Sequence, residues 1–381
     1  MNNPIYLDYM ATTPIDPEVY QAMQPYMTLD GCFGNPSSIH HKQGWQAHQA
    51  IKTATSQLCK LISAPLDSIT FTSGATESIN LALQGSAHYY QKAGNHIITF
   101  ATEHQATLQV CQRLKQQGFE ITILPVLDNG LIDLNLLKKT IKPTTTVISV
   151  LHVNNEIGVI QPIQDLAKIC KQSGVLLHVD AAQTLDKLPL SVADTPIDLM
   201  SLSSHKMYGP KGIGALYVRQ QPKRQLTPIF GDLFAHGPLR PGTLPTHQIV
   251  GMGAAAAYIQ QNLDQETQRV QRLHQLFVKH LSAIPNIQFN GCLKHRVPHN
   301  INITFNEIHG ETLIMRLTDI AASQGSACNK VGQVPSHVLT ALGLNRRQAN
   351  ATLRLSIGRY TTEQNIIQAA SHLKDIVVSL R

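Results

Sequence analysis

Lys206 is the residue with the clearest chemical potential, and it stands in a polar turn at residues 203–214. The apolar run at residues 197–202 precedes this turn and another apolar run follows it, so the sequence predicts strand, turn and strand. A lysine amine attacks a carbonyl group once its ammonium has lost a proton, and partial burial beside other cations favours that loss. His205 and Lys211 could be those neighbours. A lone lysine in a turn is usually just solvated, so a chemical role for Lys206 depends on partners elsewhere in the chain.

A second stretch with chemical potential lies at residues 72–78, between a predicted strand and a helix predicted to start near Ala75. Small hydroxyl residues and a glycine at a helix N-terminus favour phosphate binding, because free backbone N–H groups and the helix dipole point at the anion. The alternative is simple capping of the helix by Ser73. The stretch contains neither a Walker loop nor a GxGxxG motif.

Three further polar loops follow predicted strands. Asp180 follows a continuous apolar strand, where α/β proteins place ligand-binding groups, and it could pair with the protonated ring nitrogen of a pyridine cofactor or cap a helix. His104 could stack on a flat ring and exchange protons, or it could be a structural histidine. Asn154 and Asn155 could bond a phenolic oxygen or a carboxylate, or they could simply belong to a turn. Together with Lys206 and the helix N-terminus, these loops indicate a pyridoxal phosphate site.

The elements that must position these loops alternate along the chain. Short apolar runs alternate with amphipathic helical segments, which predicts an α/β domain with a mostly parallel sheet. Its predicted strands are residues 69–71, 96–100, 120–124, 146–151, 175–179, 199–202 and 215–218. A long helical stretch at residues 244–284, with room for a bend, leads to a smaller α+β domain. There the predicted strands are residues 287–289, 301–305 and 353–357, and the predicted helices are residues 311–317, 336–342 and 362–380.

This pattern predicts two domains. A large cofactor-binding domain is expected at residues 16–260. A small domain is expected to combine residues 1–15 with residues 261–381, and to carry a mobile cysteine loop at about residues 323–335.

Composition excludes several classes of protein. The chain has 381 residues and a net charge of +7, but its basic residues are scattered, so we expect no nucleic-acid partner. Its six cysteines form no CxxC pair and no Cys/His cluster, so we expect no intrinsic metal site. Sparse cysteines, an N-terminus without a signal-peptide pattern and the lack of an apolar run of about 20 residues predict a cytoplasmic protein without membrane contact.

The motifs and their order resemble those of the cysteine desulfurases of the class V aminotransferase group, particularly the iron–sulfur-cluster assembly type. The matching pieces are residues 6–14, 73–80, 102–104, 154–158, 180–183, the Lys206 turn, residues 240–243, residues 326–328 and Arg354. The resemblance extends over essentially the whole chain. It implies the fold type I architecture of pyridoxal phosphate enzymes and conversion of L-cysteine to L-alanine by a homodimer.

The resemblance also implies a role for each matching residue. Lys206 would hold the cofactor covalently and move the Cα proton of the substrate, assisted by His104. The implied cofactor-binding residues are Ala75, Thr76, His104, Asn155, Asp180, Gln183, Ser203, His205, Lys206 and, from the partner subunit, Thr243. Within this set, Asp180 would pair with the ring nitrogen. The implied substrate-binding residues are Arg354, Asn155 and Asn35, with the guanidinium of Arg354 binding the carboxylate.

Cys328 lies in a small, polar, glycine-containing stretch that predicts a mobile loop. An exposed cysteine beside Lys330 forms a thiolate more readily than a buried one, although an incidental surface cysteine is the alternative. The resemblance implies that Cys328 is the nucleophile and carries the sulfur as a persulfide. It further implies delivery to an iron–sulfur scaffold or another acceptor, with Cys328 as a transient iron–sulfur ligand alongside a partner.

Two departures from the family pattern leave questions open. Residues 231–239 lack the glutamate of the family's Gly-Gly-x-x-Glu type stretch, which puts substrate handling or rate in question. The chain ends at Arg381, directly after its last predicted helix, whereas cluster-assembly relatives continue into a tail that docks the scaffold. The alternatives are another class V enzyme, an aminotransferase or a selenocysteine lyase, and a non-catalytic paralogue that serves as a binding partner.

Overall fold

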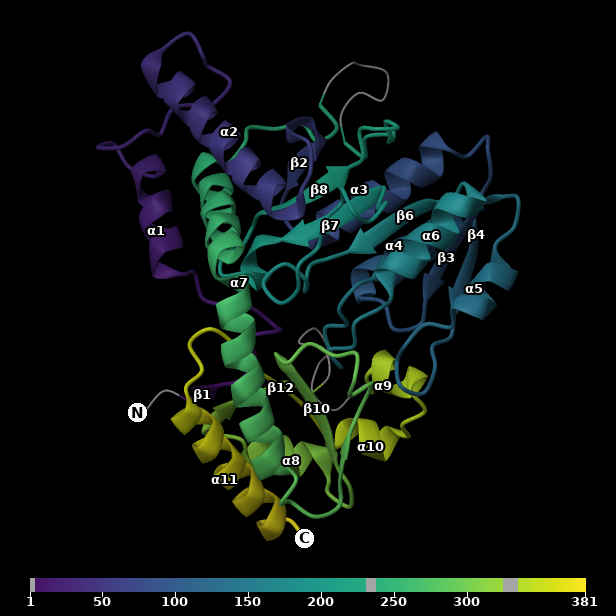
Figure 1. Cartoon of the computed structure of the whole chain (residues 1–381), viewed down its shortest axis with the longest axis vertical. Coiled ribbons are helices and arrows are strands. Elements are labelled where there is room, and N and C mark those ends of the chain that lie inside the picture. The colour runs from purple at the N-terminus through teal and green to yellow at the C-terminus, as the bar shows by residue number, and fades with distance from the viewer. Residues whose placement is uncertain (1–3, 231–237, 325–334) are drawn as a thin grey trace.

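A computed structural model describes residues 4–230, 238–324 and 335–381 of the chain (Figure 1). Within these residues, seven strands form one large sheet, and only β8 runs antiparallel to its neighbours. In order across the sheet, the strands are β2 (Ile69–Thr72), β8 (Gly214–Val218), β7 (Leu199–Ser203), β6 (Leu176–Asp180), β5 (Thr145–Leu151), β3 (His96–Phe100) and β4 (Glu120–Leu124). The predicted α/β fold with a mostly parallel sheet is confirmed.

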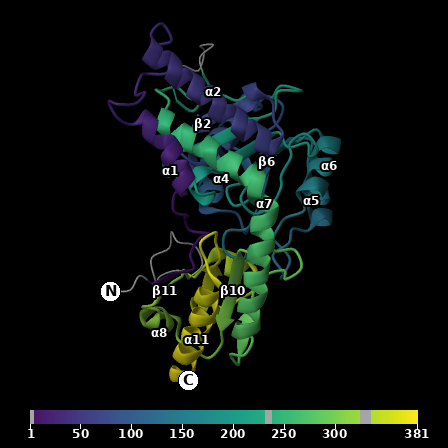
Figure 2. The same cartoon turned by 60° about the vertical axis from the view of Figure 1, so that its left-hand side comes forward.

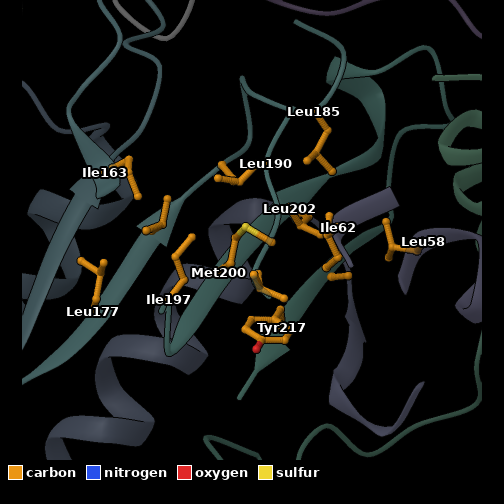
Figure 3. Packing of buried hydrophobic residues seen from close by; sticks show 14 of the residues in the cluster. Leu58, Ile62, Ile163, Leu177, Leu185, Leu190, Ile197, Met200, Leu202 and Tyr217 are labelled. Atoms are coloured by element: carbon orange, nitrogen blue, oxygen red, sulfur yellow. The ribbon is translucent and has the colours of Figure 1, made fainter. Parts of the chain in front are cut away.

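Helices cover both faces of this sheet, which explains why its central strands are continuous apolar runs. One face packs against α3 (Ala75–Tyr89) and α4 (Gln105–Gln116). The other face packs against α2 (Lys42–Ile62), α6 (Ile163–Ser173) and the first half of α7. Figure 3 shows part of the core on this other face, where Ile62 of α2 lies beside Leu202 of β7.

The longest helix, α7 (Thr246–Leu281), belongs to both hydrophobic cores. Its first half places Ile249 and Met252 in the core beneath the large sheet, and its second half places Phe277 and Leu281 in a second core. Figures 1 and 2 show α7 running from the large sheet to the lower, C-terminal part of the molecule. The helical stretch predicted at residues 244–284 is confirmed as one helix. The predicted domain boundary at residue 260 falls inside α7, and the domain division stays a prediction.

The second core lies under a small antiparallel sheet in which β10 is central. Its strands are β12 (Thr352–Ser356), β10 (Asn300–Phe305) and β9 (Ile287–Phe289), and the nearby helices are α8 (Gly310–Arg316), α9 (His337–Ala341), α10 (Arg346–Asn350) and α11 (Glu363–Ser379). The N-terminal strand β1 (Ile5–Tyr6) pairs in parallel with β11 (Ile320–Ala321), and neither strand was predicted from the sequence. The other α-helices in the described parts of the chain are α1 (Pro17–Met23) and α5 (Leu134–Thr140). In the parts of the chain that the structure describes, no helix has the length and apolarity needed to cross a membrane.

Candidate active site

A cavity of about 460 Å³ lies at the carboxyl ends of the parallel strands, the usual ligand-binding edge of such a sheet. Most of the predicted site residues line it: Ala75, Thr76, His104, Asn155, Asp180, Gln183, Ser203, His205, Lys206 and Arg354. A second cavity of about 540 Å³, beside the start of α6, contains none of the predicted site residues in its described lining. The structure therefore brings together side chains from five strand ends and from the small sheet.

Lys206 ends a single helical turn that directly follows β7; residues 204–208 are called the lysine turn below. Its Nζ donates hydrogen bonds to the carbonyl oxygens of Met10 and Ala11, at 2.8 and 2.6 Å. The N-terminal segment also contacts the turn through Thr13, whose N–H donates to the carbonyl of His205 at 3.0 Å. The N-terminal residues matched in the sequence thus orient the amine within the cavity.

Asp180 is the last residue of β6 and is 2% exposed. Its Oδ1 accepts a hydrogen bond from the backbone N–H of Ala182 at 3.0 Å. Burial raises the pKa of Asp180 to about 6, although the Ala182 hydrogen bond and the charge of Lys206 act in the opposite direction. A cationic ring nitrogen placed beside this carboxylate would supply the counter-charge that favours its ionised form.

His104 is both a helix cap and a lining residue of the cavity. Its Nδ1 accepts a hydrogen bond from the N–H of Ala106 at 3.1 Å at the start of α4. Burial, together with the charges of the nearby Lys206 and His337, lowers the pKa of His104 to about 4. The imidazole is therefore neutral near pH 7, with its proton on Nε2, and can lie against a flat ring.

The N-terminus of α3 forms the expected phosphate cradle. Gly74 is the N-cap, and no side chain of the described residues bonds to the first N–H groups of the helix, so the alternative of capping by Ser73 is wrong. The Ser73 N–H instead donates to Glu77 at 2.6 Å. A Cβ at Gly214 would lie 2.6 Å from Gly74 Cα, so only glycine lets β8 approach this cradle.

Other cavity residues add polar groups near the cradle. His205 accepts from or donates to Thr12 Oγ1 at 3.0 Å, and burial, Lys206 and Lys211 lower its pKa to about 4. Ser203 and Lys211 line the same cavity. Lys211 was expected only as a cationic neighbour of Lys206, yet its position makes it a further candidate contact for an anion.

The amide side chains of Gln183 and Asn154 differ in how many of their polar atoms are hydrogen-bonded within the protein. Gln183 donates to the carbonyl of Met10 at 2.8 Å, while its buried Oε1 has no partner in the described parts of the chain. Asn154 is fully engaged, since its amide donates to Thr102 O and its Oδ1 accepts from the N–H groups of Glu156 and of the next residue. Of the two predicted asparagines, only Asn155 lines the cavity.

Arg354 is the lining residue that the small sheet contributes to the described part of the cavity. It lies on β12, is 1% exposed, and pairs through Nη2 with Asp8 Oδ1 at 2.7 Å. Its Nη1 donates to the backbone oxygen of Asn155 at 2.9 Å, and its Nε has no partner among the described residues. Asp8 appeared in the sequence only as part of a matching motif, and its role as counter-ion was missed.

Two further predicted site residues, Asn35 and Thr243, are not among the described lining residues of this cavity. Asn35 is exposed and its Oδ1 accepts from the N–H of Ser37 at 2.9 Å. Thr243 is exposed and is not among the cavity's described lining residues. Cys328 and residues 231–237 lie outside the described residues. The roles given to all site residues stay predictions.

A family profile described as aminotransferase class-V matches residues 5–368. The chain belongs to the aminotransferase class-V family. Members of this family use pyridoxal 5'-phosphate, and the predicted family is confirmed.

Curated relatives match this chain over its full length. It is 49% identical to "Cysteine desulfurase IscS" of Mannheimia succiniciproducens and 48% identical to that of Pasteurella multocida, over 100% of this chain and 94% of each relative. The protein of the same name from Photorhabdus laumondii is 47% identical over the same shares. The expected enzyme class, a cysteine desulfurase, is confirmed by this similarity.

Solved structures of relatives agree with the fold. A "NifS-like protein" superposes with a TM-score of 0.90 at 31% identity, covering 99% of this chain and 100% of the other. "SspA in complex with cysteine" gives a TM-score of 0.82 at 36% identity, with 94% and 99% covered. DndA from Streptomyces lividans gives 0.77 at 37% identity, with 91% and 97% covered.

The cavity residues of this class-V enzyme fit pyridoxal 5'-phosphate. The helix start at Ala75 provides N–H groups without side-chain caps for the phosphate, within the described chain. Asp180 offers a buried carboxylate to a ring nitrogen, and Gln183 has a buried oxygen without a described partner. Lys206 directs an amine into the same space.

Proposed function

We propose that this protein takes L-cysteine as its substrate, releases L-alanine and retains the sulfur on Cys328. The observation that carries the proposal is the convergence of Lys206, Asp180 and Arg354 on one cavity. An amine, a buried acid and a guanidinium suit a carbonyl cofactor, its ring nitrogen and an amino-acid carboxylate. The full-length similarity to cysteine desulfurases supports the choice of substrate.

The residues of the chain divide the chemical work between them. Lys206 binds the cofactor and then carries the Cα proton of the substrate, since its amine lies in the cavity. Asp180 keeps the ring nitrogen protonated, and Arg354 holds the substrate carboxylate through its planar fork. His104 presents a neutral ring and an Nε2–H. When bound, the cofactor supplies an electron sink for the bonds at Cα.

Sulfur transfer requires a thiolate that reaches the substrate. The Cys328 thiolate attacks the substrate sulfur, so that an S–S bond forms as the carbon–sulfur bond breaks, and the carbon takes a proton to give L-alanine. The described residues that flank Cys328 in the sequence form hydrogen bonds with neighbours of the cavity residues, which supports this role. Ser323 donates to Asp8 Oδ2 at 2.8 Å, and Ser336 bonds to the carboxylate of Glu156, next to Asn155.

The active form is a homodimer in which a second copy completes each cavity. Thr243 and Asn35 lie outside the described lining of their own cavity, which leaves them available to a partner. A band of large apolar side chains between residues 20 and 45 is exposed on the single chain: Tyr20, Met27, Leu29, Phe33, Ile39 and Trp45. Such a surface suits burial against a second copy.

The sulfur acceptor rests on the family resemblance, and the cytoplasmic location rests on the cysteine pattern and the N-terminal sequence. We expect delivery to an iron–sulfur scaffold or another acceptor protein in the cytoplasm, with Cys328 as a transient ligand of the cluster. The arrangement of Lys206, Asp180 and Arg354 disfavours the non-catalytic alternative, because a binding partner needs no buried acid beside an amine.

One experiment tests the proposed reaction. The cofactor-loaded protein is incubated anaerobically with one equivalent of L-cysteine, and the peptide containing Cys328 is analysed by mass spectrometry while L-alanine is quantified. We expect one added sulfur per Cys328 and an equal amount of L-alanine. A 2-oxo acid in place of L-alanine would support an aminotransferase, and L-alanine with sulfide but an unmodified Cys328 would contradict the role of the thiolate. Cys328→Ser is the matched control and should give no added sulfur.

A further inference from the structure

Tyr208, two residues beyond Lys206, has a left-handed backbone conformation with a φ of 64°. Side chains other than glycine avoid this region because Cβ approaches the following carbonyl oxygen. Hydrogen bonds hold both backbone polar groups here: the N–H donates to Thr13 Oγ1 at 2.9 Å, and the carbonyl accepts from the N–H of Asp16 at 3.0 Å. The side chain is buried, with 4% exposed. The backbone and the side chain of Tyr208 are therefore both held in place within the lysine turn.

The guanidinium of Arg359 lies between two aromatic rings. It is 4.1 Å from the ring centroid of Tyr208 and 4.0 Å from that of Tyr258, which belongs to α7. Its Nη1 pairs with Asp16 Oδ2 at 2.5 Å, and the hydroxyl of Tyr360 donates to the same oxygen at 2.8 Å. A planar guanidinium can stack on two rings while it donates from its edge, which a lysine ammonium cannot do.

The backbone that follows β12 is packed directly against the lysine turn. The N–H of Arg359 donates to the hydroxyl of Tyr208 at 2.6 Å. A Cβ at Gly358 would lie 2.2 Å from Tyr9 Cδ1 and 2.6 Å from the Tyr208 hydroxyl, so only glycine fits there. Arg354 stands on β12, shortly before this contact. The lysine turn and the segment that follows β12 therefore meet at Tyr208 and Arg359.

We propose that Arg359 and Tyr208 are positioning residues that fix the lysine turn relative to β12. They thereby set where the amine of Lys206 lies relative to the guanidinium of Arg354. Neither Arg359 nor Tyr208 is among the described lining residues of the cavity, so both act through other groups. The inference rests on the proposed roles of Lys206 and Arg354, but cofactor affinity tests it without any turnover of L-cysteine.

The test replaces Arg359 and measures binding as well as turnover. Cofactor-free protein is titrated with pyridoxal 5'-phosphate and followed by visible absorption, and KM and kcat for L-cysteine are measured separately. For Arg359→Ala we expect kcat/KM for L-cysteine to fall by about 10- to 100-fold, because misplacing a reacting group by about 1 Å changes the rate by that much. The cofactor Kd should rise as well, because the amine that would hold the cofactor is displaced. Arg359→Lys keeps the charge opposite Asp16 but loses the planar stacking, so its Kd should lie between those of the wild type and Arg359→Ala.

A matched control separates positioning from loss of stability. Leu373 is fully buried in α11, so Leu373→Ala should lower the thermal midpoint of the cofactor-free protein while leaving the cofactor Kd within about twofold of wild type. If Arg359→Ala also changes only the thermal midpoint, the proposal is overturned. If Arg359→Ala does not fold, Tyr258→Leu removes one stacked ring and should raise the Kd by about threefold or more; an unchanged Kd in that variant overturns the proposal. A wild-type protein that binds the cofactor but leaves L-cysteine unchanged would refute the proposed function, and the cofactor titrations would still decide this inference.

Discussion

The two walls of the cavity are built in different ways. The wall on the large sheet consists of residues at successive strand ends, such as His104, Asp180 and Lys206, and each is positioned by its own strand. The wall on the small sheet centres on Arg354, whose counter-ion Asp8 comes from the opposite end of the chain. The first wall suits a cofactor that stays in place, and the second suits a substrate that comes and goes. Mutations in the first wall should therefore affect the binding and chemistry of the cofactor, and mutations in the second wall should affect the binding of the substrate.

The largest effect should come from Lys206 in the cofactor wall. Lys206→Ala removes the amine that we propose binds the cofactor and moves the Cα proton, so kcat should fall by about 10²- to 10⁴-fold. Steady-state release of L-alanine measures this. Lys211→Ala is the comparison, because Lys211 lines the same cavity but is not the proposed reacting amine, and at saturating cofactor its loss of kcat should be much smaller. A larger loss of kcat in Lys211→Ala than in Lys206→Ala would mean that the reacting amine has been assigned to the wrong lysine.

In the substrate wall, Arg354→Lys should lower kcat/KM for L-cysteine by about 10²-fold while the absorption spectrum of the bound cofactor stays unchanged. Lysine keeps the charge but lacks the fork that pairs with both Asp8 and a carboxylate. Separate titrations with the cofactor and with L-cysteine check this. A variant that loses the cofactor instead would show that the two walls are not distinct.

Asp180 gives a pH-dependent effect whose sign depends on the cofactor. Its pKa is about 6 in the folded, cofactor-free protein and about 4 in an unfolded chain, so the unfolded state ionises first as the pH rises. The cofactor-free protein should therefore lose about 3 kcal/mol of stability between about pH 4 and pH 7 through this one group. Asp180→Asn removes this loss and should stabilise the cofactor-free protein at pH 7 but not at pH 4.

Denaturant unfolding at both pH values measures this difference. With the cofactor bound, the sign should reverse, because the wild-type carboxylate then has a cationic partner. If Asp180→Asn destabilises the cofactor-free protein equally at both pH values, the buried carboxyl is not the cause.

The smallest effect should come from Ser73 at the start of α3. Since its side chain does not cap the helix, Ser73→Ala should change the free energy of unfolding by no more than about 0.5 kcal/mol. Loss of a true N-cap would cost about 1 kcal/mol. Thermal unfolding of the cofactor-free protein distinguishes these values, and a loss of the larger size would restore the capping interpretation.

The difference between the walls also explains what the sequence could predict. Asp180 and Lys206 each follow an apolar run that marks a buried strand, so a local pattern was enough to place them at one sheet edge. The pairing of Asp8 with Arg354 and the stacking of Arg359 on Tyr208 join distant parts of the chain, and no local pattern reports such a contact.

Two alternatives that the sequence left open were decided by contacts of the same kind. Whether Ser73 caps α3 depends on the position of Glu77, which accepts a hydrogen bond from the Ser73 N–H. Whether Asn154 is available to a ligand depends on Thr102 in another loop, because the Asn154 amide donates to the Thr102 carbonyl. The strands β1 and β11 were missed because each has only two residues, too few for a period to be recognised. Tertiary contacts decide all of these features.

Reductive trapping tests the central claim most directly. The protein loaded with pyridoxal 5'-phosphate is treated with borohydride, digested and mapped by mass spectrometry. The account predicts the reduced cofactor on Lys206 in every modified chain. Modification of Lys211, or of any lysine outside the cavity, with Lys206 left intact would contradict it.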